Sequence, residues 1–443
     1  MSDESDQDKT ATYQSVVAGL AMIGFATWVV LGSGLFSSAP ELTLKAQASL
    51  NKVAPDEALG SAAKAPVAAE KPTGVAPDAA AKDPLMAEII GELKSETAVP
   101  NEALLTFKDK AALAKFLKRA KGYGLEVVGT LDGLSTVRVR MDSPQKLRDY
   151  LAASGPARPA MEANHWMNVP SLAKPDASNQ GGALPSGTEF LQAVNATGER
   201  TEWGKGVTVA VLDTGVKANP TFGDNQVTHV DLVNDGTPFH SHGTSVASLI
   251  AGTDDRVPGV SPDASILDIR VANDKGYSVT SVLAQGILEA VNRGAQVLNI
   301  SMGGYDDSQV LRQAVDYALQ RGAIIVAAAG NEKYDQLAYP ARLNGVISVG
   351  SVDAKGVQAY FSNSGSGLTY VAPGVGLPVA WDTDKMAMAS GTSQSAAVVS
   401  GVAAYYMGLG LTSQNALGRM RASALPTAGT QVQRGFGIPR ARY

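Results

Sequence analysis

The chain has 443 residues, a formal net charge of −5 and no cysteine. This length exceeds that of one ordinary domain, so two or three folded units are expected. The mild negative charge does not favour nucleic-acid binding, which needs a basic patch. The absence of cysteine excludes disulfides, thiolate metal sites and a cysteine nucleophile. With only four histidines and no H-E-x-x-H motif, a zinc peptidase is not expected.

The N-terminal region divides into an acidic tail (1–14), an apolar segment (15–36) and a spacer without aromatic residues (40–84). The apolar segment carries no charge and is long enough to cross a hydrocarbon core of about 30 Å, so we expect a transmembrane helix. A cleaved signal peptide is the alternative. Against it, the start lacks a basic region and Pro40 disrupts the most obvious cleavage site. The spacer is rich in Ala, Pro, Lys and Glu, which is typical of a disordered linker.

The orientation of this predicted helix rests on few charges. Lys9 precedes the span, whereas Lys45 and Lys52 follow it, so the positive-inside rule alone favours a cytoplasmic C-terminal side. An extended spacer, however, commonly holds a domain away from a membrane in a bacterial envelope. On that analogy we expect an inner-membrane protein whose C-terminal part faces the periplasm or the exterior.

A small α+β unit is predicted over residues 98–170. Apolar alternation indicates four strands, and longer amphipathic segments indicate two helices between them. The expected order is a strand at 103–107, a helix at 108–121, strands at 125–128 and 136–140, a helix at 143–153 and a strand at 161–169. This β-α-β-β-α-β order is a ferredoxin-like pattern.

A junction rich in Ser, Gly, Pro and Asn (171–188) precedes a large domain at 189–443, in which strands and helices alternate. The strands are near-continuous apolar runs, as expected of parallel strands covered on both faces. Strands are expected at 207–212, 265–271, 297–301, 323–328 and 346–352, and helices at 245–252, 282–292, 309–321 and 394–407. The pattern predicts an α/β fold with a doubly wound parallel sheet.

Four motifs of this domain supply the groups that acyl transfer needs. Asp213 ends an apolar strand, His242 precedes Gly-Thr and a small-residue helix, Asn331 follows a strand, and Ser393 begins another small-residue helix. A serine hydroxyl is a poor nucleophile until an imidazole removes its proton, and a buried carboxylate holds that imidazole in one tautomer. The amide can donate to an oxyanion. The rival hydrolase architecture needs G-x-S-x-G, which does not occur in this chain.

These motifs, in this order, resemble the subtilisin-like serine peptidase (subtilase) family. The resemblance covers about 189–443 and extends to the segments 259–264, 301–304, 339–341, 359–365, 371–374 and 435–437. It implies that Asp213, His242 and Ser393 form a catalytic triad, that Asn331 is the oxyanion residue, and that peptide bonds are hydrolysed through an acyl-enzyme.

The resemblance also implies a substrate cleft, in which residues 301–303 pair with the substrate backbone as an edge strand. The expected substrate-binding residues are Ser301, Met302, Gly303, Gly304, Ala328, Gly330 and Ala338. Met302 and Ala338 indicate a roomy, uncharged pocket. We interpret Glu332 as a plain surface charge rather than a determinant of specificity at the pocket rim.

Three features depart from the family pattern. Ala397 and Ser395 stand where the family has Pro and Ala, which affects helix packing rather than the reacting groups. The loop 252–259 lacks the insertion that forms a calcium site in many relatives, so we interpret its acidic residues as a solvated turn and predict no cofactor and no specific metal site. Calcium binding is the alternative. His240 is interpreted as incidental, because only His242 carries the following Gly-Thr.

The segment 98–170 resembles the propeptide of this family, which assists folding and then inhibits by laying its last strand through the cleft. That strand is expected at about 162–169, with self-cleavage between Met167 and Ser186. An unrelated accessory domain is the alternative. Cleavage there would free the peptidase domain from its membrane tether.

The sequence therefore predicts a membrane-anchored, self-processed serine endopeptidase that acts on proteins or peptides. Its own propeptide would be an intramolecular inhibitor. The alternative function is a tethered, non-catalytic protein that holds peptides in the same cleft.

Overall fold

A computed structural model describes residues 83–171 and 183–442. The predicted membrane helix (15–36) and nearly all of the predicted linker lie outside these ranges. Among the described residues, no helix combines the length and apolar composition of a membrane span.

The first part of the described chain is an antiparallel α+β domain. It consists of α4 (Pro84–Leu93), β1 (Ala98–Thr106), α5 (Lys110–Leu117), β2 (Leu125–Leu131), β3 (Thr136–Met141), α6 (Pro144–Ser154) and β4 (Ala160–Asn168). All neighbouring strands are antiparallel in the order β2-β3-β1-β4, which is the ferredoxin-like arrangement. Side chains of the three helices pack over one face of this sheet.

Helix α4 is an element that the sequence analysis did not predict. Its start is nevertheless encoded locally, because the Asp83 side chain accepts hydrogen bonds from the backbone N–H groups of Leu85 (3.1 Å) and Met86 (3.3 Å). Pro84 occupies the first helical position, where its missing N–H costs nothing. Met86 and Ile89 bury the apolar side of the helix.

The second part is an α/β domain. Up to residue 320 it contains α7 (Phe190–Ala193), β5 (Thr208–Asp213), β6 (Val227–Asp231), α8 (Ser241–Ala251), β7 (Ser265–Arg270), β8 (Tyr277–Val279), α9 (Thr280–Asn292), β9 (Val297–Ile300) and α10 (Gln309–Gln320). It continues with β10 (Ile324–Ala328), β11 (Ile347–Val352), β12 (Tyr370–Pro373), β13 (Leu377–Trp381), β14 (Lys385–Ala389), α11 (Thr392–Gly408), α12 (Ser413–Ser423) and α13 (Gln431–Arg434).

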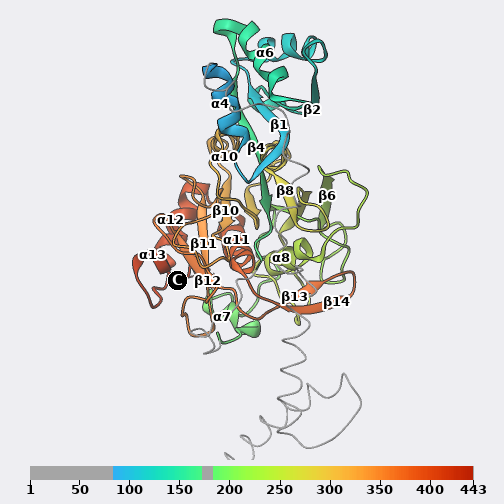
Figure 1. The fold of residues 1–443 in the computed structure, drawn as a ribbon. Coiled ribbons are helices and arrows are strands. Elements are labelled where there is room, and N and C mark those ends of the chain that lie inside the picture. Colours follow the sequence, from blue (N-terminus) through green and yellow to red (C-terminus); the bar gives the residue numbers. More distant parts are fainter. Residues whose placement is uncertain (1–82, 172–182, 443) are drawn as a thin grey trace, which may run out of the picture. The chain divides into compact units, whose positions relative to one another are not determined.

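Seven strands of this domain form a parallel sheet in the order β12-β11-β10-β9-β5-β7-β6, as predicted. Figure 1 shows the sheet with its helices. The chain leaves β5 toward β6 and β7 on one side, and later reaches β9 on the other side. Strand β5 therefore lies at the topological switch point, where parallel sheets carry their functional groups.

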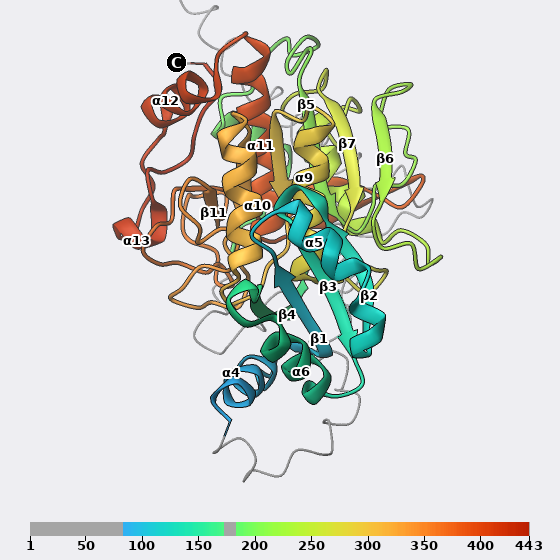
Figure 2. The same cartoon turned by 90° about the horizontal axis from the view of Figure 1, so that it is seen from above.

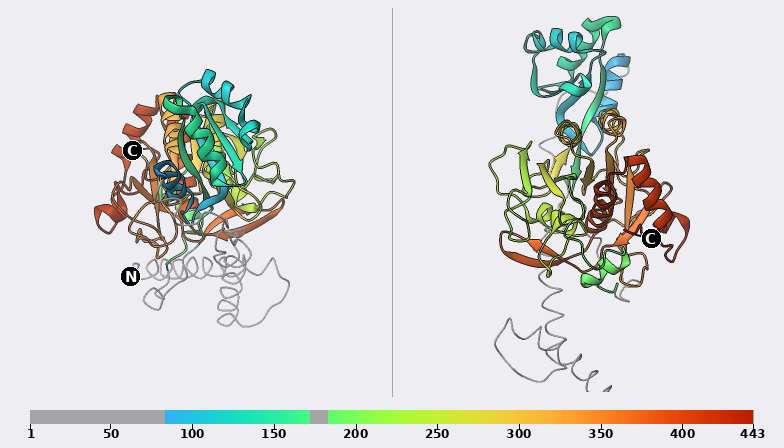
Figure 3. Two further views of the ribbon diagram at one scale, coloured as in Figure 1. Left: turned by 45° about the horizontal axis from the view of Figure 1, so that its top comes forward. Right: turned by 180° about the vertical axis from the view of Figure 1, so that it is seen from behind.

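Alternating residues of β5 enter two different cores. Val209 and Val211 pack with residues of α8 and α11, whereas Ala210 and Leu212 pack with residues of α9 and α10. The sheet is thus covered on both faces, and Figure 2 shows α9 and α10 together on one of them. Helix α12, red in Figure 3, packs against α11.

Two short pairings were not predicted. Strands β13 and β14 form an antiparallel hairpin. Strand β8 pairs with β4, so the last strand of the antiparallel domain lies against the α/β domain, with Trp166 opposite Val279 and Asn168 opposite Tyr277.

Candidate active site

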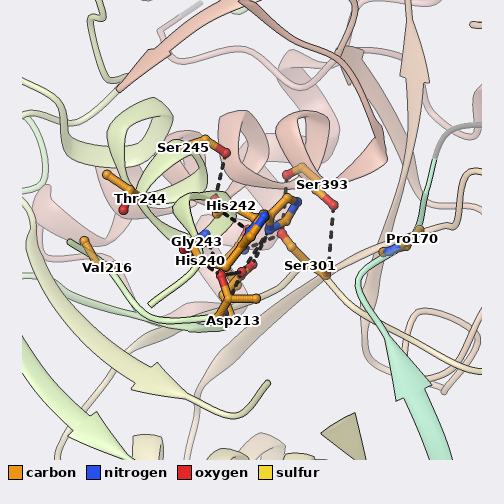
Figure 4. A network of polar contacts seen from close by, with 12 residues as sticks. Pro170, Asp213, Val216, His240, His242, Gly243, Thr244, Ser245, Ser301 and Ser393 are labelled. Carbon is orange, nitrogen blue, oxygen red and sulfur yellow. Dashed lines mark hydrogen bonds and ion pairs between the residues drawn. The ribbon is translucent and has the colours of Figure 1, made fainter. Parts of the chain in front are cut away.

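The three predicted triad residues lie at the ends of three elements. Asp213 is the last residue of β5, His242 is the second residue of α8, and Ser393 is the second residue of α11. Their exposed fractions are 0, 7 and 1%. Figure 4 shows the three side chains converging. Because two helices begin here, their positive dipole ends and unpaired N–H groups also lie at the site.

The carboxylate and the imidazole are directly paired. His242 Nδ1 lies 2.8 Å from Asp213 Oδ1 and 3.0 Å from Oδ2. The backbone N–H of Thr214 also donates to Oδ1 at 2.7 Å, and the Thr214 hydroxyl lies 3.1 Å from the same oxygen. An ionised carboxylate only accepts hydrogen bonds, so the proton of the neutral imidazole resides on Nδ1. Nε2 is left as the base.

His240 has a structural role that the sequence analysis missed, so its interpretation as incidental is wrong. Its Nδ1 accepts from the backbone N–H of His242 at 3.2 Å and thereby caps α8. Its carbonyl accepts from the Thr214 hydroxyl at 3.0 Å, which connects the cap to the Asp213 loop. A Cβ at Gly243 would lie 2.4 Å from the carbonyl oxygen of Gly215, which explains the glycine after His242.

The Ser393 hydroxyl donates to the backbone carbonyl of Ser301 at 3.3 Å. A hydroxyl has one proton and can donate it to one acceptor at a time. Ser393 must therefore turn away from Ser301 before His242 can take that proton.

The predicted oxyanion residue Asn331 is buried and held in one orientation. Its Oδ1 accepts from the backbone N–H (2.9 Å) and the hydroxyl (2.8 Å) of Thr392, the residue before Ser393. Its Nδ2 donates to the carbonyl oxygen of Pro170 at 3.1 Å. This distance is within the range in which an oxyanion donor acts. Pro170 follows β4, and Figure 4 shows it near the site.

The predicted edge strand lies beside β4. The backbone N–H of Gly303 donates to Asn168 O at 2.9 Å, and the N–H of Asn168 donates to Gly303 O at 3.0 Å. On the other side of this segment, Gly304 bridges Tyr339, whose N–H donates to Gly304 O at 2.8 Å. Met302 is buried.

The remaining predicted substrate-binding residues lie close to this segment. Ala328 ends β10. A Cβ at Gly303 would lie 3.0 Å from Ala338 Cβ, so these two residues are neighbours. Gly330 has φ +110°, and a Cβ there would lie 2.1 Å from Asn363 Nδ2, so both the backbone and the space require glycine.

Glu332 is not the plain surface charge that we expected. It is half-buried, accepts hydrogen bonds from the Tyr305 hydroxyl and from Asn363 Nδ2 (3.1 Å), and borders Gly330. Burial and the neighbouring Glu332 raise the pKa of Tyr305, so the phenol remains a donor to this carboxylate.

A second buried carboxylate lies behind the triad, and the sequence analysis missed it. Asp268 Oδ2 accepts from the backbone N–H of Val216 (2.9 Å) and from His229 Nδ1 (2.8 Å). Burial raises the pKa of Asp268, and the negative charge of Asp213 adds to this shift. The available signal was an acidic residue between the apolar Leu267 and Ile269 of β7.

In the acidic turn of the loop 252–259, an arginine side chain pairs with one of the carboxylates. Arg256 donates to both carboxylate oxygens of Asp254 and holds its pKa at about 2. Within the described ranges, no group of three or more His, Asp or Glu side chains is placed to hold a metal ion.

Comparisons with known proteins agree with this geometry. A family model described as the Subtilase family matches residues 204–438. Subtilisin BL of Lederbergia lenta is 37% identical over 228 residues, covering 50% of this chain and 83% of that protein. Thermitase of Thermoactinomyces vulgaris is 35% identical over 234 residues, covering 51% and 84%.

One solved structure matches a larger part of the chain. Fervidolysin from Fervidobacterium pennivorans, described as a keratinolytic enzyme related to subtilisin, matches with a TM-score of 0.66 and 25% identity over 79% of this chain and 61% of that one. Residues 183–443 are only about three-fifths of the chain. The match therefore extends into the antiparallel domain.

Coverage of the relatives differs. The chain spans 59% of the M-protease of Shouchella clausii, at 37% identity, and more than four-fifths of subtilisin BL. The family match covers more than half of the chain and includes the residues that carry the paired carboxylate, imidazole and hydroxyl. The chain therefore belongs to the Subtilase family, as a subtilisin-like serine protease.

Proposed function

We propose that this protein is a membrane-anchored serine endopeptidase that is made as a self-inhibited precursor and processes itself. The observation that carries the proposal is the position of β4, which pairs with β8 and Gly303 and ends with the Pro170 carbonyl at the Asn331 amide. A peptide chain thus lies along the candidate site in an extended conformation, as a substrate or a product would.

The site residues suit one mechanism. Ser393 Oγ attacks the scissile carbonyl carbon while His242 Nε2 takes the hydroxyl proton, and Asp213 stabilises the resulting imidazolium. Asn331 Nδ2 and the first N–H groups of α11 donate to the oxyanion. The proton then passes to the leaving amine, and water hydrolyses the acyl-enzyme.

The contacts of the antiparallel domain support a role as an intramolecular inhibitor. Glu162 accepts from the Ser308 hydroxyl (2.7 Å) and from the backbone N–H groups of Gln309 (2.7 Å) and Val310 (3.1 Å). It thereby caps α10 of the other domain. Leu104 and Leu131 join the apolar core formed by α9 and α10. These polar and apolar contacts hold β4 along the cleft and exclude other substrates.

Two further contacts join the antiparallel domain to the α/β domain, and a third connects one of them to β4. Asn164 Oδ1 accepts from the backbone N–H of Ser281 at 3.1 Å. Asp306 Oδ2 accepts from the Thr97 hydroxyl at 2.5 Å, and the same hydroxyl lies 3.0 Å from His165 Nδ1. Each contact joins a polar side chain to a defined partner, so together they fix the register of the strand.

The membrane part of the proposal comes from the sequence. The apolar segment 15–36 and the spacer 40–84 precede the antiparallel domain, and a cut after β4 separates them from the catalytic residues. Processing would then leave the peptidase domain attached to the membrane only through its non-covalent contacts with the antiparallel domain. We propose an outward-facing inner-membrane location and release after processing.

Labelling and fractionation together test this function. A fluorophosphonate probe should label the wild-type chain and a remote Ser423→Ala control, but not Ser393→Ala. In membranes of expressing cells, a salt wash should release the peptidase domain of the wild type and leave Ser393→Ala in the pellet as a full-length chain. A folded wild-type chain that is neither cut nor labelled would instead favour a non-catalytic peptide-binding protein. A wild-type peptidase domain that resists the wash would contradict release.

A further inference from the structure

The end of β4 has the burial pattern of a peptide bound in successive pockets. Met167 and Val169 are each 3% exposed, whereas Asn168 between them is exposed. The Val169 N–H donates to Gly276 O at 2.9 Å, and Asn168 exchanges two hydrogen bonds with Gly303. The strand is therefore held by backbone bonds on both sides up to the residue before Pro170.

One backbone carbonyl of this segment lies at the oxyanion donor and so identifies the bond that would be cut. Asn331 Nδ2 donates to Pro170 O at 3.1 Å, and the Thr392 contacts keep this amide from turning. The donor must stabilise the oxygen of the carbonyl that is attacked, so the carbonyl next to it belongs to the scissile bond.

The strand register shows what proline removes at this position. In an antiparallel pair, hydrogen-bonded positions recur every second residue. Because Asn168 is the hydrogen-bonded partner of Gly303, residue 170 is the partner of Ser301, and its N–H would donate to Ser301 O. Proline has no N–H. The hydrogen bond that Ser301 O accepts comes instead from the Ser393 hydroxyl, at 3.3 Å.

We infer that Pro170–Ser171 is the bond that the protein cuts in itself, and that Pro170 slows this cut because Ser301 O retains the nucleophile. The inference rests on the proposed endopeptidase function and adds its processing bond and a built-in control of its rate. Residue 170 with an N–H would compete with the Ser393 hydroxyl for Ser301 O and so favour transfer of the Ser393 proton to His242.

The reaction balances without a further reagent. Ser393 Oγ bonds to the Pro170 carbonyl carbon, and its proton moves to His242 and then to the Ser171 nitrogen as the C–N bond breaks. Ser171 leaves with a free amine. Water then hydrolyses the ester, which gives a Pro170 carboxylate and restores Ser393.

The test follows the freshly purified full-length chain by intact mass and by N-terminal sequencing of the product. The wild type should yield a fragment that begins at Ser171. Pro170→Ala should be cut at the same bond about 2- to 10-fold faster, the factor that one hydrogen bond of ordinary net strength contributes. Pro156→Ala, an exposed proline of the same domain, is the matched control and should be cut at the wild-type rate.

Each other result has a defined meaning. A wild-type product that begins elsewhere, with Ser393 still labelled by the fluorophosphonate, would overturn the bond assignment and leave the proposed function intact. An unchanged or slower rate in Pro170→Ala would overturn the control by proline, provided that Pro170→Ala in the Ser393→Ala background melts at the temperature of Ser393→Ala alone. A folded chain that is neither cut nor labelled would overturn the proposed function itself.

Discussion

Glu162 is the residue through which β4 contacts the first turn of α10, and replacing it tests how the inhibitory strand is held. Oε1 accepts from the Ser308 hydroxyl and the Val310 N–H, and Oε2 accepts from the Gln309 N–H. Glu162→Ala removes all three acceptors, whereas Glu162→Gln retains one oxygen and loses the contact to one donor.

The expected magnitudes follow from this count. Losing a helix cap costs about 1–2 kcal/mol, which raises the population of undocked β4 about 5- to 30-fold. Losing one ordinary hydrogen bond costs about 0.5–1 kcal/mol, or about 2- to 5-fold. Burial raises the pKa of Glu162, although the hydrogen bonds oppose this shift. Docking therefore does not favour the charged Glu162 carboxylate over the neutral acid, and the neutral amide of Glu162→Gln should retain most of the contact.

The assay is native-state hydrogen exchange at the Gly303 amide, which donates to Asn168 O only while β4 is docked. The Ser393→Ala background prevents self-cutting. Exchange should rise 5- to 30-fold in Glu162→Ala and 2- to 5-fold in Glu162→Gln. It should stay constant in Glu88→Ala, which removes only an exposed ion pair with Arg158. Unchanged exchange in Glu162→Ala, or an equal rise in exchange in both Glu162 variants, would refute the reasoning.

Three further predictions concern the peptidase domain. Asn331→Ala should slow self-processing about 10²- to 10³-fold by intact mass, the loss established for one oxyanion donor in subtilisin itself; a smaller loss would mean that other donors suffice. The hydrogen bond to Asp268 raises the pKa of His229 above 6.5. The stabilisation that protonated His229 gives the folded state is therefore complete below pH 6.5, and it is lost as the pH rises through the raised pKa. Urea unfolding of the inactive chain should show this decline in the free energy of unfolding, and His229→Gln should abolish it. Equal pH slopes of this free energy with and without His229→Gln would contradict the pairing. Gly401→Ala places a Cβ 2.6 Å from a buried valine side chain and should cost about 1–3 kcal/mol by thermal melting, whereas Gly418→Ala, with nothing within 4 Å, should not.

Much of the fold could be predicted because the apolar patterns are long and regular. The strands of the antiparallel domain alternate over several residues, and those of the parallel sheet are continuous apolar runs. Both patterns gave bounds within a few residues of β2, β5 and β10. The candidate triad could be placed in the chain because each residue adjoins a strand end or a helix start, which is where a parallel sheet gathers functional groups.

The missed features depend on distant partners. Strand β8 has three residues and is defined only by its pairing with β4. His240 acts through the Thr214 hydroxyl and the start of α8, and Asp268 acts through Val216 and His229, so neither role leaves a local pattern. Glu332 lies on a loop, where charge alone predicts exposure, but Tyr305 and Asn363 hold it partly buried.

The central claim is that Ser393, activated by His242, cuts the chain between the antiparallel domain and the peptidase domain. Intact mass of the purified wild type beside Ser393→Ala over time tests it most directly. The account predicts that the wild type converts into two fragments that separate after Pro170, while Ser393→Ala keeps its full mass under the same conditions. A wild-type chain that stays whole, or a Ser393→Ala chain that is cut at the same rate, would contradict it.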